Sequence, residues 1–119
     1  MAEKIKHYNQ LEVWKKSHQL TLQIYQITKS FPAEERFGLV SQMRRAAVSV
    51  PANIVEGFRR RSNKEKLRFY GISQSSADEL SYFLILSQDL GYLKNIESES
   101  KWAESIVMML AALMRTIQE

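Results

Sequence analysis

Residues 96–117 read IESESKWAESIVMMLAALMRTI, and the apolar residues of this stretch recur every three or four positions. This spacing places them along one side of an α-helix, while Lys101, Glu104 and Arg115 face away from it. The apolar side consists of Trp102, Ile106, Met109, Leu110, Leu113 and Ile117. The stretch therefore predicts an amphipathic helix, N-capped by Asn95, that packs against other helices.

The sequence before this stretch contains signals that begin and end further helices. One helix is predicted over residues 11–30, because Asn9 and Glu12 have the spacing of a capping box and Phe31-Pro32 disfavours helical backbone. A second helix is predicted from residue 34 or 39 to residue 60. It contains a proline at position 51, which removes a backbone donor and is expected to kink the helix for structural reasons.

A third helix is predicted after Ser62 and up to Leu90. Ser62 and Glu65 form another capping-box pair, and Gly91 suits the left-handed conformation that commonly follows a helix. Four helices of about 20 residues with short connections predict an all-α fold, an antiparallel up-down-up-down four-helix bundle. The length predicts a single domain over residues 1–119.

The composition limits the class of protein. Of the 119 residues, 45% are hydrophobic and 25% are charged, which is typical of a globular chain and argues against disorder. The absence of cysteine excludes disulfides, thiolate metal sites and cysteine nucleophiles. The polar first ten residues do not resemble a signal peptide, and no apolar run approaches the roughly 20 residues that cross a bilayer. We therefore expect a cytoplasmic protein with no membrane partner.

The first two predicted helices each carry apolar residues on two sides. In residues 11–30, one stripe comprises Val13, Leu20, Ile24, Ile27 and Phe31, and a second contains Leu11, Trp14, His18, Leu22 and Tyr25. Residues 39–60 have a core stripe of Met43, Ala47, Val50, Ile54 and Phe58, with Val48 and Val55 toward the other side. Because one core buries one side of a helix, we predict a subunit interface formed by Leu11, Trp14, His18, Leu22, Tyr25, Val48 and Val55. The alternative is apolar side chains scattered over the surface, which is common.

The third predicted helix places a carboxylate on its core side. Its apolar residues are Phe69, Ile72, Leu80, Phe83 and Leu90, and Glu79 is placed among them. A buried carboxylate needs partners, which the second helix or a neighbouring subunit would supply. The predicted polar network that fixes helix register contains Gln42, Arg45, Ser49, Asn53, Glu56 and Glu79. The alternative is a binding or catalytic role for Glu79.

Basic residues gather between the second and third predicted helices. Six of them lie within residues 59–68, where Glu65 alone opposes them, and Arg44 lies upstream on a neighbouring side of the second helix. Together with a net charge of +4 and a pI of about 9.4, they favour an anionic partner. The predicted nucleic-acid-binding residues are Arg44, Arg59, Arg60, Arg61, Lys64, Lys66 and Arg68, which would contact phosphates without reading sequence. The alternative is a solvated charged turn.

Patterns of catalytic and metal sites are missing from the sequence. A di-iron bundle needs Glu-x-x-His pairs, but no glutamate has a histidine three residues later, and only His7 and His18 occur. Every glycine is isolated, so there is no phosphate-binding loop. The neighbours Ser17 and His18 point apart on a helix and cannot act as a nucleophile–base pair. We predict no catalytic residue, no metal, no cofactor and no enzymatic activity.

The second helix also carries a family resemblance. The segments FP at 31–32, ERFGL at 35–39 and QMRRAAVSVPANIVEG at 42–57 resemble the signature of the four-helix-bundle family named after proteins encoded in 23S rRNA intervening sequences. LEVW at 11–14 and the stretch from Phe69-Tyr70 to Leu80 are similar to it as well. The resemblance covers nearly the whole chain.

This resemblance implies an antiparallel four-helix bundle that assembles as a homopentamer and has no established enzymatic activity. It also implies similarity to the accessory proteins of diversity-generating retroelements, which are basic pentamers that bind nucleic acid and a reverse transcriptase. We therefore expect an oligomer that binds nucleic acid, RNA more than DNA. The alternatives are a protein-interaction adaptor, such as an accessory subunit for a polymerase-type partner, and a helix-turn-helix DNA reader, which Pro51 disfavours.

Overall fold

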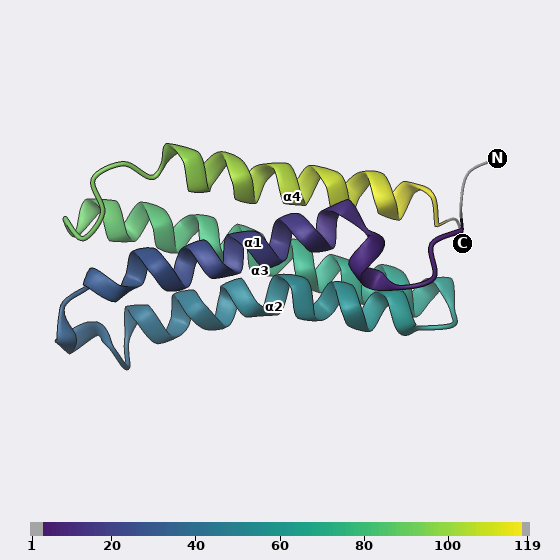
Figure 1. Cartoon of the computed structure of the whole chain (residues 1–119), viewed down its shortest axis with the longest axis horizontal. Coiled ribbons are helices and arrows are strands. Elements are labelled where there is room, and N and C mark those ends of the chain that lie inside the picture. The colour runs from purple at the N-terminus through teal and green to yellow at the C-terminus, as the bar shows by residue number, and fades with distance from the viewer. Residues whose placement is uncertain (1–3, 118–119) are drawn as a thin grey trace.

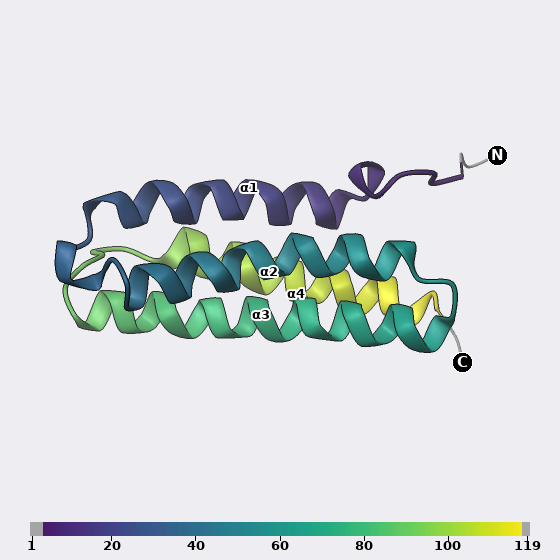
Figure 2. The ribbon, with the colours of Figure 1, turned by 90° about the horizontal axis from the view of Figure 1, so that it is seen from below.

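The computed structural model describes residues 4–117, and the regular structure in this range is helical throughout. The four main helices are α1 (Glu12–Ile27), α2 (Leu39–Arg59), α3 (Asn63–Asp89) and α4 (Glu97–Arg115), and they run antiparallel and side by side (Figures 1 and 2). There are also three 3-10 turns in this range: η1 (Tyr8–Gln10) precedes α1, and η2 (Thr28–Ser30) and η3 (Ala33–Glu35) lie between α1 and α2. The predicted all-α four-helix bundle is confirmed. Residues 1–3 and 118–119 of the predicted domain lie outside the described residues.

The core follows the predicted stripes of α1, α2 and α4. Val13, Leu20 and Ile24 are buried in α1, and Ile106 and Leu110 are buried in α4. The α2 stripe of Met43, Ala47, Val50 and Ile54 is buried too. Their burial supplies the main driving force for packing the helices together. Within residues 4–117, no helix is long and apolar enough to span a membrane.

Ser62 is the N-cap of α3 as predicted, but the N-cap of α4 is Ile96 rather than the predicted Asn95, and that of α1 is Leu11 rather than Asn9. The backbone N–H of Glu65 donates to Ser62 Oγ at 3.1 Å, and that of Glu97 donates to Asn95 Oδ1 at 2.9 Å. Gly91 has a φ of 85°, the left-handed conformation predicted for it. The predicted capping box of Asn9 and Glu12 is wrong, because the separate turn η1 precedes α1. α4 also ends at Arg115, two residues before the predicted end.

The buried side of α3 differs from the predicted stripe. Leu80 and Phe83 are buried, but Ile72 and Leu90 are exposed. The side that packs on the bundle instead contains Tyr70, Ser73, Ser76, Ala77, Leu84 and Ser87. Serine can replace larger side chains here because its hydroxyl bonds to buried acceptors, as Ser73 Oγ does to the carbonyl oxygen of Val50 at 2.8 Å. These small residues allow α2 and α3 to make the most extensive helix contact of the bundle.

Pro51 lies inside α2 without ending it, and α1 supplies what it lacks. Proline has no N–H, so it cannot donate to the carbonyl oxygen of Ala47 one turn earlier. The hydroxyl oxygen of Thr21, which is buried on α1, lies 2.9 Å from that carbonyl oxygen and donates to it. The carbonyl therefore has a partner from a neighbouring helix in the dry interior, which avoids the cost of an unpaired buried acceptor.

The two loops at the η3 end of the bundle are joined by a tyrosine. Tyr92 Oη donates a hydrogen bond to Glu35 Oε2 at 2.9 Å, and Glu35 Oε1 accepts the backbone N–H of Leu39 at 3.1 Å. Glu35 therefore holds the start of α2 and the α3–α4 loop together. The hydrogen bond to Glu35 raises the pKa of the Tyr92 phenol, with further contributions from burial and from the charges of Glu35 and Glu34.

Candidate nucleic-acid interface

The basic residues surround the turn between α2 and α3, at the end of the bundle opposite η3 (Figure 1). At this end the two helices approach closely, because position 57 of α2 has no side chain. A Cβ built on Gly57 would lie 2.6 Å from Cε1 of Tyr70, whose buried ring occupies that space. Burial raises the pKa of the Tyr70 phenol. The Gly57–Tyr70 contact thus sets the distance between α2 and α3 at the turn that carries the basic residues.

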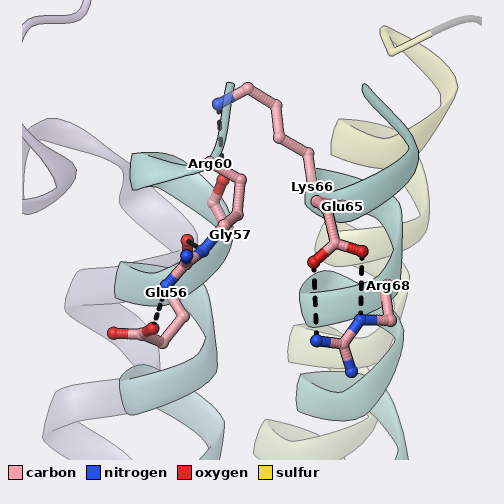
Figure 3. Close-up of polar contacts among 6 residues, drawn as sticks. All are labelled: Glu56, Gly57, Arg60, Glu65, Lys66 and Arg68. Atoms are coloured by element: carbon pink, nitrogen blue, oxygen red, sulfur yellow. Dashed lines mark hydrogen bonds and ion pairs between the residues drawn. The ribbon is translucent and has the colours of Figure 1, made fainter. Parts of the chain in front are cut away.

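Three of the six cations in residues 59–68 are engaged within the chain. Lys66 Nζ donates to the carbonyl oxygen of Gly57 at 3.3 Å (Figure 3). It also donates to the carbonyl oxygen of Phe58 at 2.9 Å, so it neutralises the negative end of α2. Arg60 forms an ion pair with Glu56, and Arg68 Nε lies 3.3 Å from Glu65 Oε2 (Figure 3). Two carboxylates therefore oppose the cluster, Glu65 within residues 59–68 and Glu56 just before them.

The other three cations are Arg59, Arg61 and Lys64, which we call the open cations. Each is exposed, and within residues 4–117 none has a carboxylate at ion-pair distance. The guanidinium of Arg59 lies 6.0 Å from the centre of the Tyr8 ring. The open cations are therefore free to meet an external anion, whereas Glu56 and Glu65 offset the charges of Arg60 and Arg68.

Arg44 does not belong to this cluster. Its Nε donates to Thr28 Oγ1 at 3.0 Å, and its NH2 donates to the carbonyl oxygen of Tyr25 at 3.2 Å. It precedes Arg59 by fifteen residues, or roughly 22 Å of helix, since an α-helix rises about 1.5 Å per residue. The structure thus places Arg44 at the other end of α2, where it holds the last turn of α1.

The predicted polar network is smaller than expected. Glu79 is exposed rather than buried and, within residues 4–117, forms no ion pair. Ser49 Oγ lies 2.8 Å from Ser76 Oγ, and Asn53 Nδ2 donates to Ser49 Oγ at 2.9 Å. Of the other predicted members, Glu56 pairs with Arg60, while Gln42 and Arg45 line an open polar hollow with Glu79. A buried charged network therefore does not set the register here.

The second apolar stripe of α1 has two different halves. Leu11 and Trp14 are half-buried against the core, and the Trp14 ring is covered by Tyr8 at 5.1 Å and stacked on His18 at 5.2 Å between ring centres. Leu22 and Tyr25, farther along, are exposed, as is Val48 of α2, whereas Val55 is half-buried. Phe37, in the turn before α2, is 89% exposed. The chain's own N-terminal segment thus covers one half and leaves the other bare.

The chain matches a known protein family over most of its length. The family model described as 23S rRNA-intervening sequence protein matches residues 9–112. The chain belongs to this family. The match to the intervening-sequence family includes Gly57 and the whole α2–α3 junction. No significant match was found among curated proteins.

A solved structure shares the fold of this intervening-sequence family member. It is a crystal structure of a protein with unknown function from the S23 ribosomal protein family of Bacteroides thetaiotaomicron. The two chains superpose with a TM-score of 0.79 at 24% sequence identity, over 87% of this chain and 98% of the other. At that identity the likeness establishes the bundle architecture and leaves activity to be argued from the residues.

Proposed function

We propose that this protein is a non-enzymatic, cytoplasmic nucleic-acid-binding protein that contacts the phosphate backbone, with RNA as the favoured ligand. The observation that supports the proposal is the set of open cations, Arg59, Arg61 and Lys64, which are exposed and lack carboxylate partners among the described residues. An arginine guanidinium can donate two parallel hydrogen bonds to phosphate oxygens. The three charges lie where α2 ends and α3 begins. Such contacts confer affinity without sequence preference.

The test is binding of labelled RNA and DNA across a salt series by fluorescence anisotropy. Changing Arg59, Arg61 and Lys64 together to alanine removes about three phosphate contacts. For a single strand, the slope of log affinity against log salt concentration is then expected to fall by about 2. The matched control changes Lys29, Arg36 and Lys94 to alanine, which lowers the net charge equally but at the opposite end of the bundle.

The control variant is expected to keep the wild-type slope. Equal losses in both variants would show that net charge alone attracts the polymer, and the assignment of the interface to the junction would fail. If the wild type binds neither RNA nor DNA at low salt, the proposal itself fails. In that case a pull-down that returns one acidic protein of polymerase type would favour the adaptor function.

We also propose that the protein is a homo-oligomer, with five subunits as the family resemblance implies. The bare half of the α1 stripe supports this: Tyr25, Phe37 and Val48 line one open hollow of about 700 Å³, and Leu22 is exposed beside them on α1. An apolar area of this kind gains free energy when a second surface covers it. The predicted interface then shifts away from Leu11, Trp14 and His18 and toward Phe37.

Phe37→Asp is expected to turn the assembled protein into a 13.9 kDa monomer, because a charge would have to be buried where a phenyl ring was. Size-exclusion chromatography with light scattering measures the mass directly. Met108→Asp on α4 is the control, since Met108 is also exposed but lies outside this surface. A wild-type protein that is monomeric at micromolar concentration would refute the assembly.

A further inference from the structure

Four aromatic side chains form a continuous series of ring contacts beside Arg59, one of the open cations. His7 and Tyr8 have ring centres 4.2 Å apart, Tyr8 and Trp14 are 5.1 Å apart, and Trp14 and His18 are stacked at 5.2 Å with planes within 10° of parallel. We call this set the aromatic ladder. The aromatic ladder extends from the N-terminal segment through η1 to the first turns of α1. These residues are distant in sequence from the basic residues 59–68, but Tyr8 lies beside Arg59.

Arg59 connects the ladder to the open cations. Its guanidinium lies 6.0 Å from the centre of the Tyr8 ring, at the point where η1 contacts α2. A planar cation beside an aromatic ring is a favourable arrangement, and it leaves the other guanidinium N–H groups available to an anion. The structure thus places the Arg59 guanidinium beside the Tyr8 ring and the aromatic series that continues from it.

The ladder lies at the surface rather than in the core. His7 is exposed, and Tyr8, Trp14 and His18 are half-buried, so none of the four belongs to the buried core. The segment is nevertheless held in place, because Gln10 Oε1 accepts the backbone N–H groups of Lys6 at 2.7 Å and His7 at 2.9 Å. Trp14 also packs against the core. The open rings are therefore presented on a fixed support.

We propose that this surface binds single-stranded nucleic acid, with bases stacking on the His7–Tyr8 end of the ladder while the open cations hold the adjoining phosphates. In a duplex the bases are paired and stacked on one another, so their faces cannot reach these rings, whereas unpaired bases can be splayed out onto them. Stacking of this kind is tolerant of base identity, which fits a surface with few groups that could read base edges. The inference rests on the proposed function and deepens it by naming the class of strand.

The test separates stacking from charge by using two ligands of equal charge. A labelled oligothymidylate is compared with an equally long oligomer of abasic deoxyribose phosphates by anisotropy. The wild type is expected to bind oligothymidylate more tightly. Tyr8→Ala is expected to weaken that binding about fivefold or more, with no effect on the abasic oligomer, and Tyr8→Phe is expected to retain it. An oligoribothymidylate and a DNA duplex extend the comparison to the sugar and to pairing.

A second readout uses the ladder itself. The chain has two tryptophans, so Trp102→Phe leaves Trp14 as the sole indole emitter. Oligothymidylate is expected to quench Trp14 fluorescence in this variant, and the abasic oligomer is not. Unchanged thermal unfolding of Tyr8→Ala and Trp102→Phe confirms that both variants fold.

The outcomes distinguish the two proposals. Equal affinity of the wild type for oligothymidylate and the abasic oligomer overturns the stacking surface. An equal loss for both ligands in Tyr8→Ala overturns it too, because Tyr8 would then act only by supporting Arg59. If these results occur while the variant lacking Arg59, Arg61 and Lys64 still shows a salt slope lower by about 2, phosphate binding stands without base stacking. If no ligand binds the wild type, both proposals fail together.

Discussion

Gly57→Ala is expected to lower the free energy of unfolding by about 1–3 kcal/mol, because a methyl group there would overlap the buried ring of Tyr70. The added Cβ would lie 2.6 Å from Cε1 and 2.8 Å from Cδ1 of that ring, closer than carbon atoms can approach. The rigid ring is 3% exposed, so α2 and α3 must separate to admit the methyl group. Urea denaturation of the wild type and the variant measures the loss.

Gly71→Ala is the matched control, one residue after Tyr70 on α3. A Cβ there would meet nothing within 4 Å, so the gain from replacing a helical glycine, about 0.5–1 kcal/mol, is expected without a clash. If the free energy of unfolding falls in Gly57→Ala and rises in Gly71→Ala, the loss at position 57 is due to the contact with the Tyr70 ring. A stabilised Gly57→Ala protein would instead mean that Tyr70 moves freely, and that the glycine does not set the helix spacing at the basic junction.

The same helix pair shows where sequence reasoning stops. Periodicity located the core sides of α1, α2 and α4 because most of their buried residues are apolar. On α3, Ser73, Ser76 and Ser87 occupy buried positions, and a hydropathy pattern reads them as polar although their hydroxyls are bonded inside the bundle. The hydropathy pattern therefore predicted the wrong orientation of α3 about its axis. It assigned Glu79 and Ile72 to the core side, although both are exposed.

The candidate interface was predictable in part. The run of six cations is visible in the sequence, and the spacings Glu56–Arg60 and Glu65–Arg68 are those at which helical side chains meet. These spacings account for the pairing of Arg60 and Arg68, whereas the bonds of Lys66 to the carbonyl oxygens of Gly57 and Phe58 depend on how the turn folds. Tyr8 could not be assigned, because its place beside Arg59 depends on the N-terminal segment folding back over α1 and α2, and no local pattern encodes that contact.

Thr21→Val is expected to lower the free energy of unfolding by about 1–3 kcal/mol, since it removes the hydroxyl that donates to the carbonyl oxygen of Ala47 and leaves that acceptor unpaired in the core. The two side chains have nearly the same shape, so little packing changes. The need for this hydroxyl arises from Pro51, which has no N–H to offer the same carbonyl. Urea denaturation of Thr21→Val, Pro51→Ala and the double variant measures how far the effect of Thr21 depends on Pro51.

In a Pro51→Ala background, the new backbone N–H can reach the Ala47 carbonyl within α2, and Thr21→Val is then expected to cost less. A coupling of about 1 kcal/mol or more between positions 21 and 51 is the expected result, as for residues that share one hydrogen-bonding partner. Ser17→Ala serves as the control, because the Ser17 hydroxyl bonds to the Val13 carbonyl of its own helix, so its cost should not depend on residue 51. If Thr21→Val costs the same in both backgrounds, the hydroxyl serves the neighbouring Ser17 carbonyl, 3.0 Å away, and α2 accommodates its proline without help from α1.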